Sequence, residues 1–373
     1  MTRVLALVTF KVFPPQMGGQ KGVVLFYKHL KGFLAICMAV SKNNAPPPTG
    51  WDVQPVLFDN RKMFQNPFVF KKLKKLIREK KIQVIVAEHS YAGWMALVLK
   101  KMFQIPFVIH SHNIEARRFQ QMGRPGWQAY HAYEKWIHQK ADHNFFISKE
   151  DEAYALQHFR LQSAKCSVIT YGVEQTLVTV AQVKQLKEKL GLTESETIFY
   201  FNGTLDYKPN VDAVQVMINH ILPMLQKDLP SFKIIITGNR APHALEQQLK
   251  GTKNILYLGF VEDIQPYYAM AHVFLNPVQN NSGIKTKVVE AIAAGCTVIS
   301  TESGAAGLNH KVCGDKLRLV KDGDWATMVQ LALQAAKQPN APTPKAFYDS
   351  YLWNNIAQQA ALQIEAVARQ YAH

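Results

Sequence analysis

The hydrophobic positions of the chain follow two alternating patterns. Short apolar runs typical of buried strands alternate with segments in which apolar residues recur every three or four positions, which is typical of helices. In the first half, strands are predicted near Val4–Phe10, Phe33–Val40, Val53–Phe58, Gln83–Ala87, Phe107–Ser111, Asn144–Ile147 and Ser167–Thr170. In the second half, strands are predicted near Ile198–Phe201, Phe232–Thr237, Ile255–Leu258, Val273–Leu275, Thr297–Ser300 and Leu317–Val320. Repeated strand-helix-strand units predict an α/β protein whose parallel sheets are covered by helices on both faces.

A polar segment without a strand pattern, residues 172–195, separates the two series. Because 373 residues exceed what one hydrophobic core usually carries, we predict two doubly wound domains, residues 1–172 and 173–345. A final segment, residues 346–373, has a long helical pattern. Ligands of such folds bind at the carboxyl ends of the strands, so the two domains are expected to face each other across a cleft.

The composition describes a basic, folded chain. Lys and Arg number 43 against 27 Asp and Glu, a net charge of +16, which favours an anionic partner: nucleic acid, an anionic membrane face or a phosphorylated substrate. The sequence contains no run of about 18 apolar residues, so no membrane span is predicted. The cysteines are scattered, without a CxxC pair, and indicate buried thiols in a reducing compartment. Together with a first segment that is too short for a signal peptide, this predicts a cytoplasmic protein.

The segment NNSGIKTKVVEAIAAGCTVIST, residues 280–301, predicts a loop, a helix and a buried strand. A loop of small residues before a helix presents unpaired backbone N–H groups and the positive end of the helix dipole, which suits a phosphate. Lys285 and Lys287 fall in the first turn, where they either bind an anion or lie on a solvated face. Glu290 lies among apolar neighbours, and it is either near the surface or held for a hydroxyl such as that of a ribose.

Other polar residues follow predicted strands. Gly18 and Gly19 form a turn after the first strand, although glycine pairs mark many ordinary turns. His110 and His112 lie two positions apart near the end of the fifth strand, and we expect them on opposite faces, one of them structural. A metal site is not predicted there, because no third ligand is evident. Lys208 and a glycine follow the first strand of the second half and also suit phosphate.

The one DxD segment, Asp322-Gly323-Asp324, precedes a predicted helix that begins near Trp325. Aspartate is a preferred helix N-cap, so capping by Asp324 is favoured over metal binding.

Basic residues concentrate between Lys71 and Lys81, where seven of eleven residues are Lys or Arg. The apolar residues Val69, Leu73, Leu76 and Ile77 form one stripe that is expected to pack on the first sheet. The basic face is either simply solvated or in contact with an anionic cytoplasmic membrane leaflet.

Aromatic residues recur at a three-residue helical spacing farther along the first half. The set comprises Trp127, Tyr130, Tyr133 and Trp136, with Trp94 before it. Such a run either lines an acceptor surface or belongs to the core, and the core is the more common outcome.

Four segments, in this order and spacing, resemble nucleotide-sugar glycosyltransferases of family four with the GT-B fold. They are HNIEARR, NGTLDYKPNVDAV, LGFVEDIQPYYAMAHVFLNP and SGIKTKVVEAIAAGCTVIST. The resemblance covers nearly the whole chain and implies two Rossmann-like parallel-sheet domains facing across a cleft, with the C-terminal helix crossing back to the N-domain. It also implies retaining, hexosyltransferase-type transfer without a metal or other cofactor.

The resemblance assigns roles to single residues. Glu290 would bind the donor ribose, Lys208 would grip the diphosphate, and His112 would lie near the transferred sugar, with His110 as the fallback. Gly18 and Gly19 would form the glycine loop of the N-domain. The other residues implied at the donor are Gly203, Thr204, Gly259, Phe260, Val261, Asn281, Ser282, Gly283, Ile284 and Lys285.

Two positions depart from the family pattern. Ser282 stands where the family has the first of two glutamates, so the sugar cannot be inferred, and Thr204 stands where a basic residue commonly follows the glycine. Lys285 is the expected substitute for the second loss.

The implied donor is a nucleotide sugar, and the implied acceptor is a glycan or a lipid-linked molecule in cell-surface polysaccharide or lipopolysaccharide assembly, with no nucleic-acid partner. The enzyme is expected in the cytoplasm, with peripheral membrane contact through Lys71–Lys81. Two alternatives stay open: a nucleotide-sugar epimerase of the same fold, and a degenerate, non-catalytic anion-binding protein, which the missing carboxylate at Ser282 supports.

Overall fold

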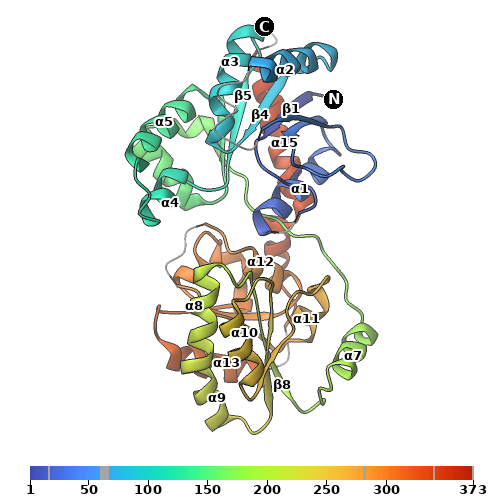
Figure 1. Ribbon diagram of the computed structural model, residues 1–373, viewed down its shortest axis with the longest axis vertical. Helices are drawn as coiled ribbons and strands as arrows, with labels where there is room; N and C mark the ends of the chain where they lie inside the picture. Colours follow the sequence, from blue (N-terminus) through green and yellow to red (C-terminus); the bar gives the residue numbers. More distant parts are fainter. Residues whose placement is uncertain (16, 59–66, 280–282, 339–340, 372–373) are drawn as a thin grey trace. The chain divides into compact units, whose positions relative to one another are not determined.

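The structure is a computed structural model that describes residues 1–15, 17–58, 67–279, 283–338 and 341–371 (Figure 1). The chain divides into two compact units. Unit 1 comprises Met1–Gly172 together with Trp353–His373, and unit 2 comprises Val173–Leu352. The C-terminal segment of unit 1 therefore begins at Trp353 rather than at residue 346.

Unit 1 is built on a parallel sheet of seven strands in the order β3-β2-β1-β4-β5-β6-β7. The strands are β1 (Arg3–Val8), β2 (Ala35–Ser41), β3 (Val53–Leu57), β4 (Val84–Glu88), β5 (Phe107–Ser111), β6 (His143–Phe146) and β7 (Cys166–Val168). The main helices between them are α1 (Gly18–Leu30), α2 (Pro67–Glu79), α3 (Gly93–Phe103), α4 (Glu115–Gln121), α5 (Trp127–Lys140) and α6 (Lys149–Tyr154). The strand order reverses between β1 and β4, and the loops that follow these two strands flank the usual ligand position of such a sheet.

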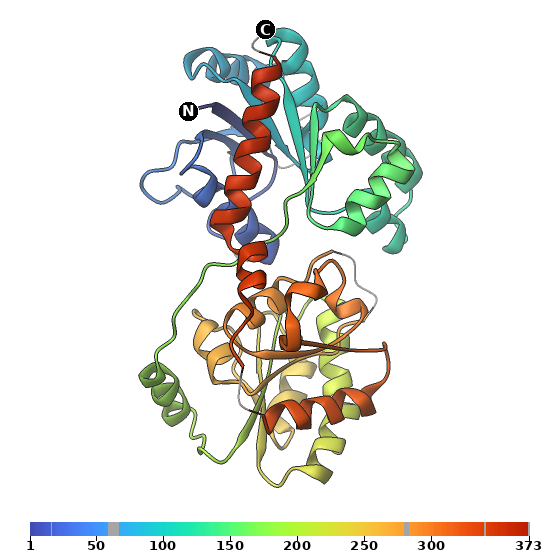
Figure 2. The same ribbon diagram turned by 180° about the vertical axis from the view of Figure 1, so that it is seen from behind.

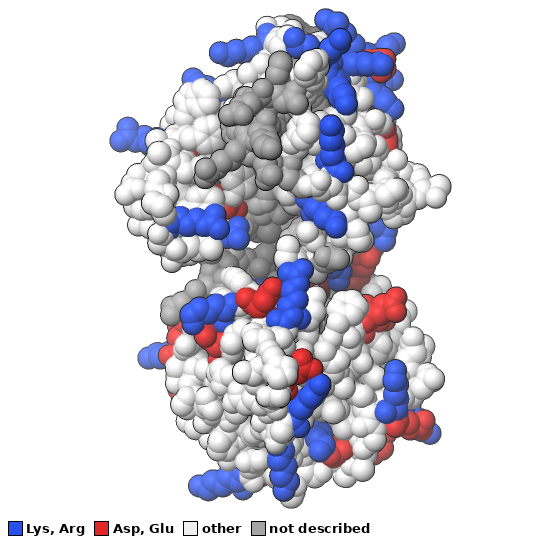
Figure 3. All heavy atoms as spheres, viewed as in Figure 1, with Lys and Arg blue, Asp and Glu red and all other residues white. Residues whose placement is uncertain are grey.

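The core of unit 1 lies between this sheet and its helices. Strands β1 and β4 are buried almost throughout, as expected for parallel strands that are covered on both faces. The predicted apolar stripe of α2 is confirmed, because Val69, Leu73, Leu76 and Ile77 are all buried. Lys and Arg side chains gather at the end of unit 1 that carries α2 and α3 (Figure 3).

Unit 2 is built on a parallel sheet of six strands in the order β10-β9-β8-β11-β12-β13. The strands are β8 (Thr197–Asn202), β9 (Phe232–Thr237), β10 (Ile255–Tyr257), β11 (Val273–Asn276), β12 (Thr297–Thr301) and β13 (Leu317–Val320). The helices are α7 (Val180–Lys189), α8 (Lys208–Val216), α9 (Leu222–Asp228), α10 (His243–Gly251), α11 (Gln265–Met270), α12 (Thr286–Ala293), α13 (Trp325–Ala336) and α14 (Lys345–Tyr351). Here the order reverses between β8 and β11. All predicted strands are present in both sheets, so the doubly wound α/β prediction is confirmed.

The C-terminal helical region is interrupted once. Helix α14 ends at Tyr351 in unit 2, and α15 (Trp353–Gln370) belongs to unit 1. The break falls at Leu352, which is extended and forms a bridge with Val173, whose N–H also donates to the Tyr351 carbonyl at 2.7 Å. Helix α15 then packs against α1 (Figure 2). Within the described residues, no helix combines the length and the apolar character that crossing a membrane requires.

Candidate functional site

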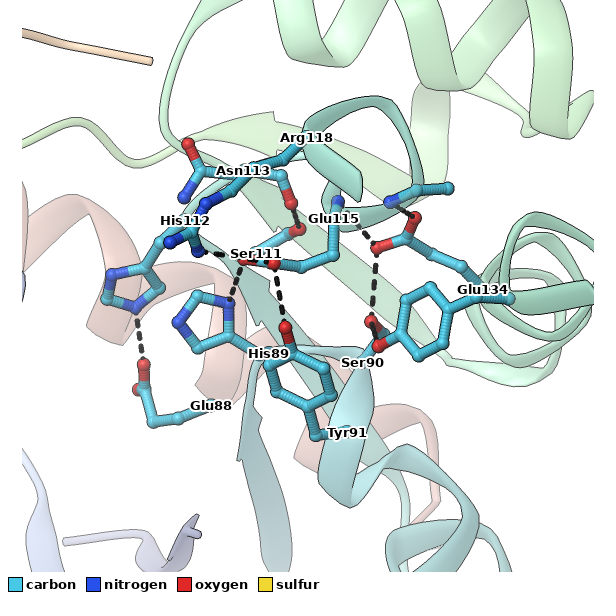
Figure 4. A network of polar contacts seen from close by, with 12 residues as sticks. Glu88, His89, Ser90, Tyr91, Ser111, His112, Asn113, Glu115, Arg118 and Glu134 are labelled. Atoms are coloured by element: carbon cyan, nitrogen blue, oxygen red, sulfur yellow. Dashed lines mark hydrogen bonds and ion pairs between the residues drawn. The ribbon is translucent and has the colours of Figure 1, made fainter. Parts of the chain in front are cut away.

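A buried carboxylate lies at the end of β4. Glu88 is fully buried and is the shared partner of three side chains from α1 and from the end of β5. The Tyr27 hydroxyl donates to Oε1 at 2.6 Å, and His110 Nδ1 lies 3.1 Å from Oε1. His112 Nε2 lies 2.6 Å from Oε2 (Figure 4). The cluster therefore lies at the carboxyl edge of the sheet, beside the point where the strand order reverses.

The charge state of this cluster follows from its contacts. Burial alone would raise the pKa of Glu88, but its electrostatic interactions and hydrogen bonds with His110 and His112 outweigh burial and hold that pKa well below its usual range. With Glu88 ionised, a neutral His112 carries its proton on Nε2, which faces the carboxylate. Its Nδ1 then keeps a lone pair that is able to accept a hydrogen bond from a hydroxyl group.

The prediction that His110 and His112 lie on opposite faces is wrong. Side chains two positions apart along a strand share a face, and the two imidazole centroids are only 4.5 Å apart. The expectation that no third ligand is present is also wrong, because Glu88 contacts both rings. Its sequence signal was a lone acid at the end of the apolar run VIVAE.

Among the described residues, Glu88, His110 and His112 form a group that could hold a metal ion, since their ligand atoms lie within 4.8 Å of one another. Two ligands of one tetrahedral zinc ion are separated by roughly 3.3 Å, given bonds of about 2 Å. The 2.6 Å between His112 and Glu88 is instead a hydrogen-bond distance. The pair is hydrogen-bonded in this arrangement, and the absence of a metal requirement stays a prediction.

A second carboxylate fixes the turn that contains the HNIEARR segment. Glu134 of α5 accepts hydrogen bonds from the backbone N–H groups of Glu115 (3.1 Å) and Ala116 (2.9 Å) and from the Ser90 hydroxyl (3.1 Å) (Figure 4). It therefore caps the N-terminus of α4 from a neighbouring helix. Burial raises the pKa of Glu134 to about 7, although these hydrogen bonds act in the opposite direction.

This raised pKa predicts a pH dependence of stability. The ordinary value for Glu134 is 4.5 and the native value is about 7, so between these values the native state holds a proton that the unfolded chain releases. The unfolding free energy should therefore fall as the pH rises through this window, by up to about 3 kcal/mol. In urea denaturation at several pH values, Glu134→Gln should lose this slope. Parallel curves for the two proteins would contradict the assignment.

The aromatic run on α5 does not form one surface. The Tyr133 hydroxyl donates to the Ser90 carbonyl at 2.8 Å and Tyr130 bonds the Ser90 hydroxyl at 2.9 Å, so both have structural partners. Trp136 is 43% exposed and Trp127 is half-buried. An acceptor contact by the tryptophans stays a prediction.

The two glycines of the predicted N-domain loop begin helix α1 and are exposed. A side chain built on Gly19 would meet nothing within 4 Å. The packing of the described residues therefore does not require glycine at position 19, and space is open beside its backbone.

In unit 2, three loops at the carboxyl edge of the sheet are joined by backbone contacts. The Gly203 N–H donates to the Thr237 carbonyl at 3.1 Å, and the Gly238 N–H donates to the Gly259 carbonyl at 2.7 Å. A Cβ on Gly238 would lie 1.9 Å from the Gly203 carbonyl oxygen, so only glycine fits. The loops after β8, β9 and β10 therefore form one rigid edge that includes Gly203 and Gly259.

Helix α12 brings a cation and a carboxylate to the same edge. Lys285, the residue before the helix, is only 7% exposed and donates to the Gly283 carbonyl at 2.5 Å. Glu290 is 9% exposed and accepts from the Tyr268 hydroxyl at 3.4 Å. The Asn202 side chain in turn donates to that hydroxyl at 2.8 Å, which links Glu290 to the end of β8.

The alternative of a freely solvated Lys287 is wrong, because its ammonium has partners within unit 2. Its ammonium donates to the Asn202 carbonyl at 2.7 Å and to Asn210 Oδ1 at 2.8 Å, and it lies 4.0 Å from the Phe201 ring centre. Burial lowers its pKa to about 7. Lys287 therefore ties α12 to the end of β8 and the start of α8.

Lys208 begins α8, with its side chain 83% exposed and its ammonium 2.8 Å from Asp212. Thr204 is half-buried in the preceding loop. Arg240, which was not among the predicted site residues, lies beyond the end of β9. Its guanidinium is 3.3 Å from the carboxylate of Asp206, which belongs to the same loop after β8 as Thr204. Arg240 thus brings a second cation to the loop that contains Thr204. The sequence did not show this pairing, because the two partners are 34 residues apart.

The remaining residues that were predicted to bind the donor differ in their exposure to solvent. Phe260 is 73% exposed, whereas Val261, Gly283 and Ile284 are half-buried. Asn281 and Ser282 lie outside the described residues.

The capping role predicted for Asp324 is confirmed. Its carboxylate accepts from the Thr327 N–H at 3.0 Å at the start of α13. Asp322 bonds instead to Ser303, so the two carboxylates of the DxD segment have separate partners.

Two Rossmann-like units of this kind define the GT-B architecture. Comparison with known families agrees with the division into units. A model described as "Glycosyltransferase Family 4" matches residues 37–176, and one described as "Glycosyl transferases group 1" matches residues 196–338. The chain belongs to the family-four glycosyltransferases, and the resemblance seen in its sequence is confirmed.

One curated relative is a Klebsiella pneumoniae protein described as "Uncharacterized 44.6 kDa protein in cps region". It is 29% identical over 132 residues, and the match spans 33% of each chain.

Solved structures of the same fold match along nearly their full length. Sucrose-phosphate synthase from Thermosynechococcus elongatus is 18% identical, with a TM-score of 0.70 over 100% of this chain and 98% of the other. Anabaena HepE in complex with UDP and glucose is 16% identical, with a TM-score of 0.72 over 98% and 100%. WaaG, a glycosyltransferase involved in lipopolysaccharide biosynthesis, is 14% identical, with a TM-score of 0.67 over 96% and 99%.

Proposed function

We propose that this glycosyltransferase moves a hexose from a nucleoside-diphosphate sugar to a glycan or lipid-linked acceptor, with retention of configuration and without a metal. The HepE structure binds UDP and glucose, and WaaG acts in lipopolysaccharide biosynthesis, which supports a nucleotide-sugar donor and a cell-surface acceptor.

The observation that carries this proposal is the placement of Lys285 and Glu290 at the carboxyl edge of the second sheet. Both charged residues are more than nine-tenths buried, yet polar contacts hold Lys285 directly before α12 and Glu290 near the middle of this helix. A carboxylate held there suits ribose hydroxyls, and a cation beside a helix N-terminus suits a diphosphate. We assign the donor nucleotide to this edge of unit 2, with Lys208 as a further cation for the phosphates.

The chemistry follows from where charge develops. When the bond between the anomeric carbon and the phosphate oxygen breaks, negative charge grows on the departing nucleoside diphosphate. Fixed cations and backbone N–H groups stabilise that charge, and losing one such group typically costs about 3 kcal/mol in the transition state. Lys285, Lys208 and the first N–H groups of α12 supply this stabilisation in the proposed mechanism, in place of a divalent ion.

In unit 1, His112 is assigned to the transferred sugar. Its Nε2 is held by Glu88, and its Nδ1 is left to accept a hydrogen bond from a sugar hydroxyl. Glu88 is then a positioning residue, because it acts on the sugar only through His112.

Helix α2 is assigned to the membrane surface. Its apolar side packs into the core of unit 1, and its basic side chains stay at the surface, which suits attraction to an anionic leaflet. Such peripheral contact would bring the enzyme to a lipid-linked acceptor on the cytoplasmic side.

A product assay tests the function. The protein is incubated in EDTA with a panel of nucleotide sugars, with and without glycan or lipid-linked acceptors, and released nucleotide and product anomer are measured. We expect slow nucleotide release without an acceptor, faster release with one, and a product that keeps the donor's anomeric configuration. Equally fast release without any acceptor would favour the epimerase, and an inverted product would contradict retention.

A further inference from the structure

His89 has a backbone conformation that side chains rarely adopt. Its φ of 63° and ψ of 162° lie in a region that is essentially reserved for glycine. Such strain persists only where the surroundings enforce it, and it concentrates at functional sites. His89 directly follows Glu88, the carboxylate that holds His112.

The neighbouring contacts enforce this conformation. The His89 N–H donates to the His110 carbonyl at 2.8 Å, so its backbone is tied to the end of β5. Its ring lies against the His112 ring, with centroids 4.5 Å apart and planes at 28°, which is a stacked arrangement. The Phe10 ring meets His89 edge-on at 5.5 Å.

The orientation of the His89 ring also has a polar cause. Its Nδ1 and the Glu115 Oε1 are both buried without a hydrogen-bond partner among the described residues, and they lie 3.5 Å apart (Figure 4). Burial lowers the pKa of His89, so its ring is neutral. A neutral His89 with its proton on Nδ1 places that N–H beside Glu115, without the geometry of a hydrogen bond. The other oxygen of Glu115 is held by the Tyr91 hydroxyl at 2.7 Å.

We propose that His89 is a positioning residue that clamps the flat face of His112, while Glu88 fixes its Nε2. The two restraints act on different parts of the ring. Glu88 sets the tautomer through Nε2, and the stacked His89 ring prevents the His112 ring from turning about its hydrogen bond to Glu88. Together they aim Nδ1 at the sugar hydroxyl. The catalytic consequence rests on the proposed function, whereas the restraint on the His112 ring does not.

The clamp makes an unusual prediction about stability and activity. In His89→Gly the backbone strain is relieved, because glycine adopts this conformation freely. Its melting temperature should therefore be no lower than that of His89→Ala, which loses the same ring contacts but keeps the strain. The turnover number should nevertheless fall about tenfold or more, because a mobile His112 is seldom in the productive geometry. Donor affinity should stay unchanged.

Three variants separate the stack from the imidazole itself. His89→Phe keeps an aromatic face against His112 and should retain most of the turnover that His89→Gly and His89→Ala lose. His158→Ala is the matched control, because His158 is an exposed histidine of the same unit whose ring lies 4.1 Å from that of Tyr154. It should change nothing.

The deciding measurement is NMR of the His112 ring in protein carrying labelled histidine. In His89→Gly and His89→Ala the His112 ring signals should shift and broaden, whereas His89→Phe and the control should leave them sharp. Unchanged His112 signals in His89→Gly would overturn the clamp, as would a His89→Phe enzyme no more active than His89→Gly. If the wild type transfers no sugar at all, the proposed function fails, while the ring signals still decide the clamp.

Discussion

Replacing His112 with alanine is expected to lower the turnover number by roughly 10²- to 10³-fold while the dissociation constant of the donor changes little. The reason is that His112 is assigned to the sugar in unit 1, whereas the nucleotide is assigned to unit 2. The measurement combines single-turnover transfer rates with calorimetric donor affinity.

Glu88→Gln provides the intermediate control for this prediction. The amide keeps the shape but removes the charge that fixes the tautomer of His112, so the turnover number should fall by less than in His112→Ala. Normal turnover in His112→Ala would remove this residue from the site, and an equal loss of donor binding would place it with the nucleotide instead.

Replacing Glu290 with alanine is expected to abolish the rise in melting temperature that the nucleotide produces in the wild type. Hydrogen bonds to a charged group contribute about 1.5–3 kcal/mol, so the loss of ribose contacts should weaken binding about 10- to 100-fold. Thermal shift and calorimetry with nucleoside diphosphates measure this.

The matched control is Glu246→Ala, which removes an exposed acid of the same unit that pairs with Lys250 on the surface of α10. It should leave nucleotide binding unchanged. If Glu290→Ala retains the full thermal shift, Glu290 does not contact the nucleotide.

The fold was predictable from sequence because parallel strands covered on both faces are continuous apolar runs with an unambiguous pattern. Every predicted strand is present, including short ones such as β10 and β13. Only the edges were inexact. The break at Leu352 was missed, because it depends on a bridge to Val173, which is distant in sequence.

The partners of polar residues were not predictable, because periodicity tells which face a residue occupies but not which side chain it meets. Lys287 was expected either to bind an anion or to be solvated, yet its partners are Asn202 at the end of β8 and Asn210 in α8, 85 and 77 positions earlier in the chain. His112 and Glu88 are 24 residues apart and meet only because β4 and β5 pair side by side.

The expectation that His110 and His112 point apart failed because successive residues alternate between the two faces of a strand, so residues two positions apart share a face. The two rings accordingly lie together, with centroids 4.5 Å apart.

The most direct test of the central claim is nucleotide binding by the wild-type protein in EDTA. Isothermal titration calorimetry with UDP, GDP, other nucleoside diphosphates and their sugar conjugates should reveal at least one saturable, metal-independent ligand that binds one site per chain. If no member of the panel binds with or without Mg²⁺, the assignment of a nucleotide-sugar donor to the carboxyl edge of the second sheet is wrong.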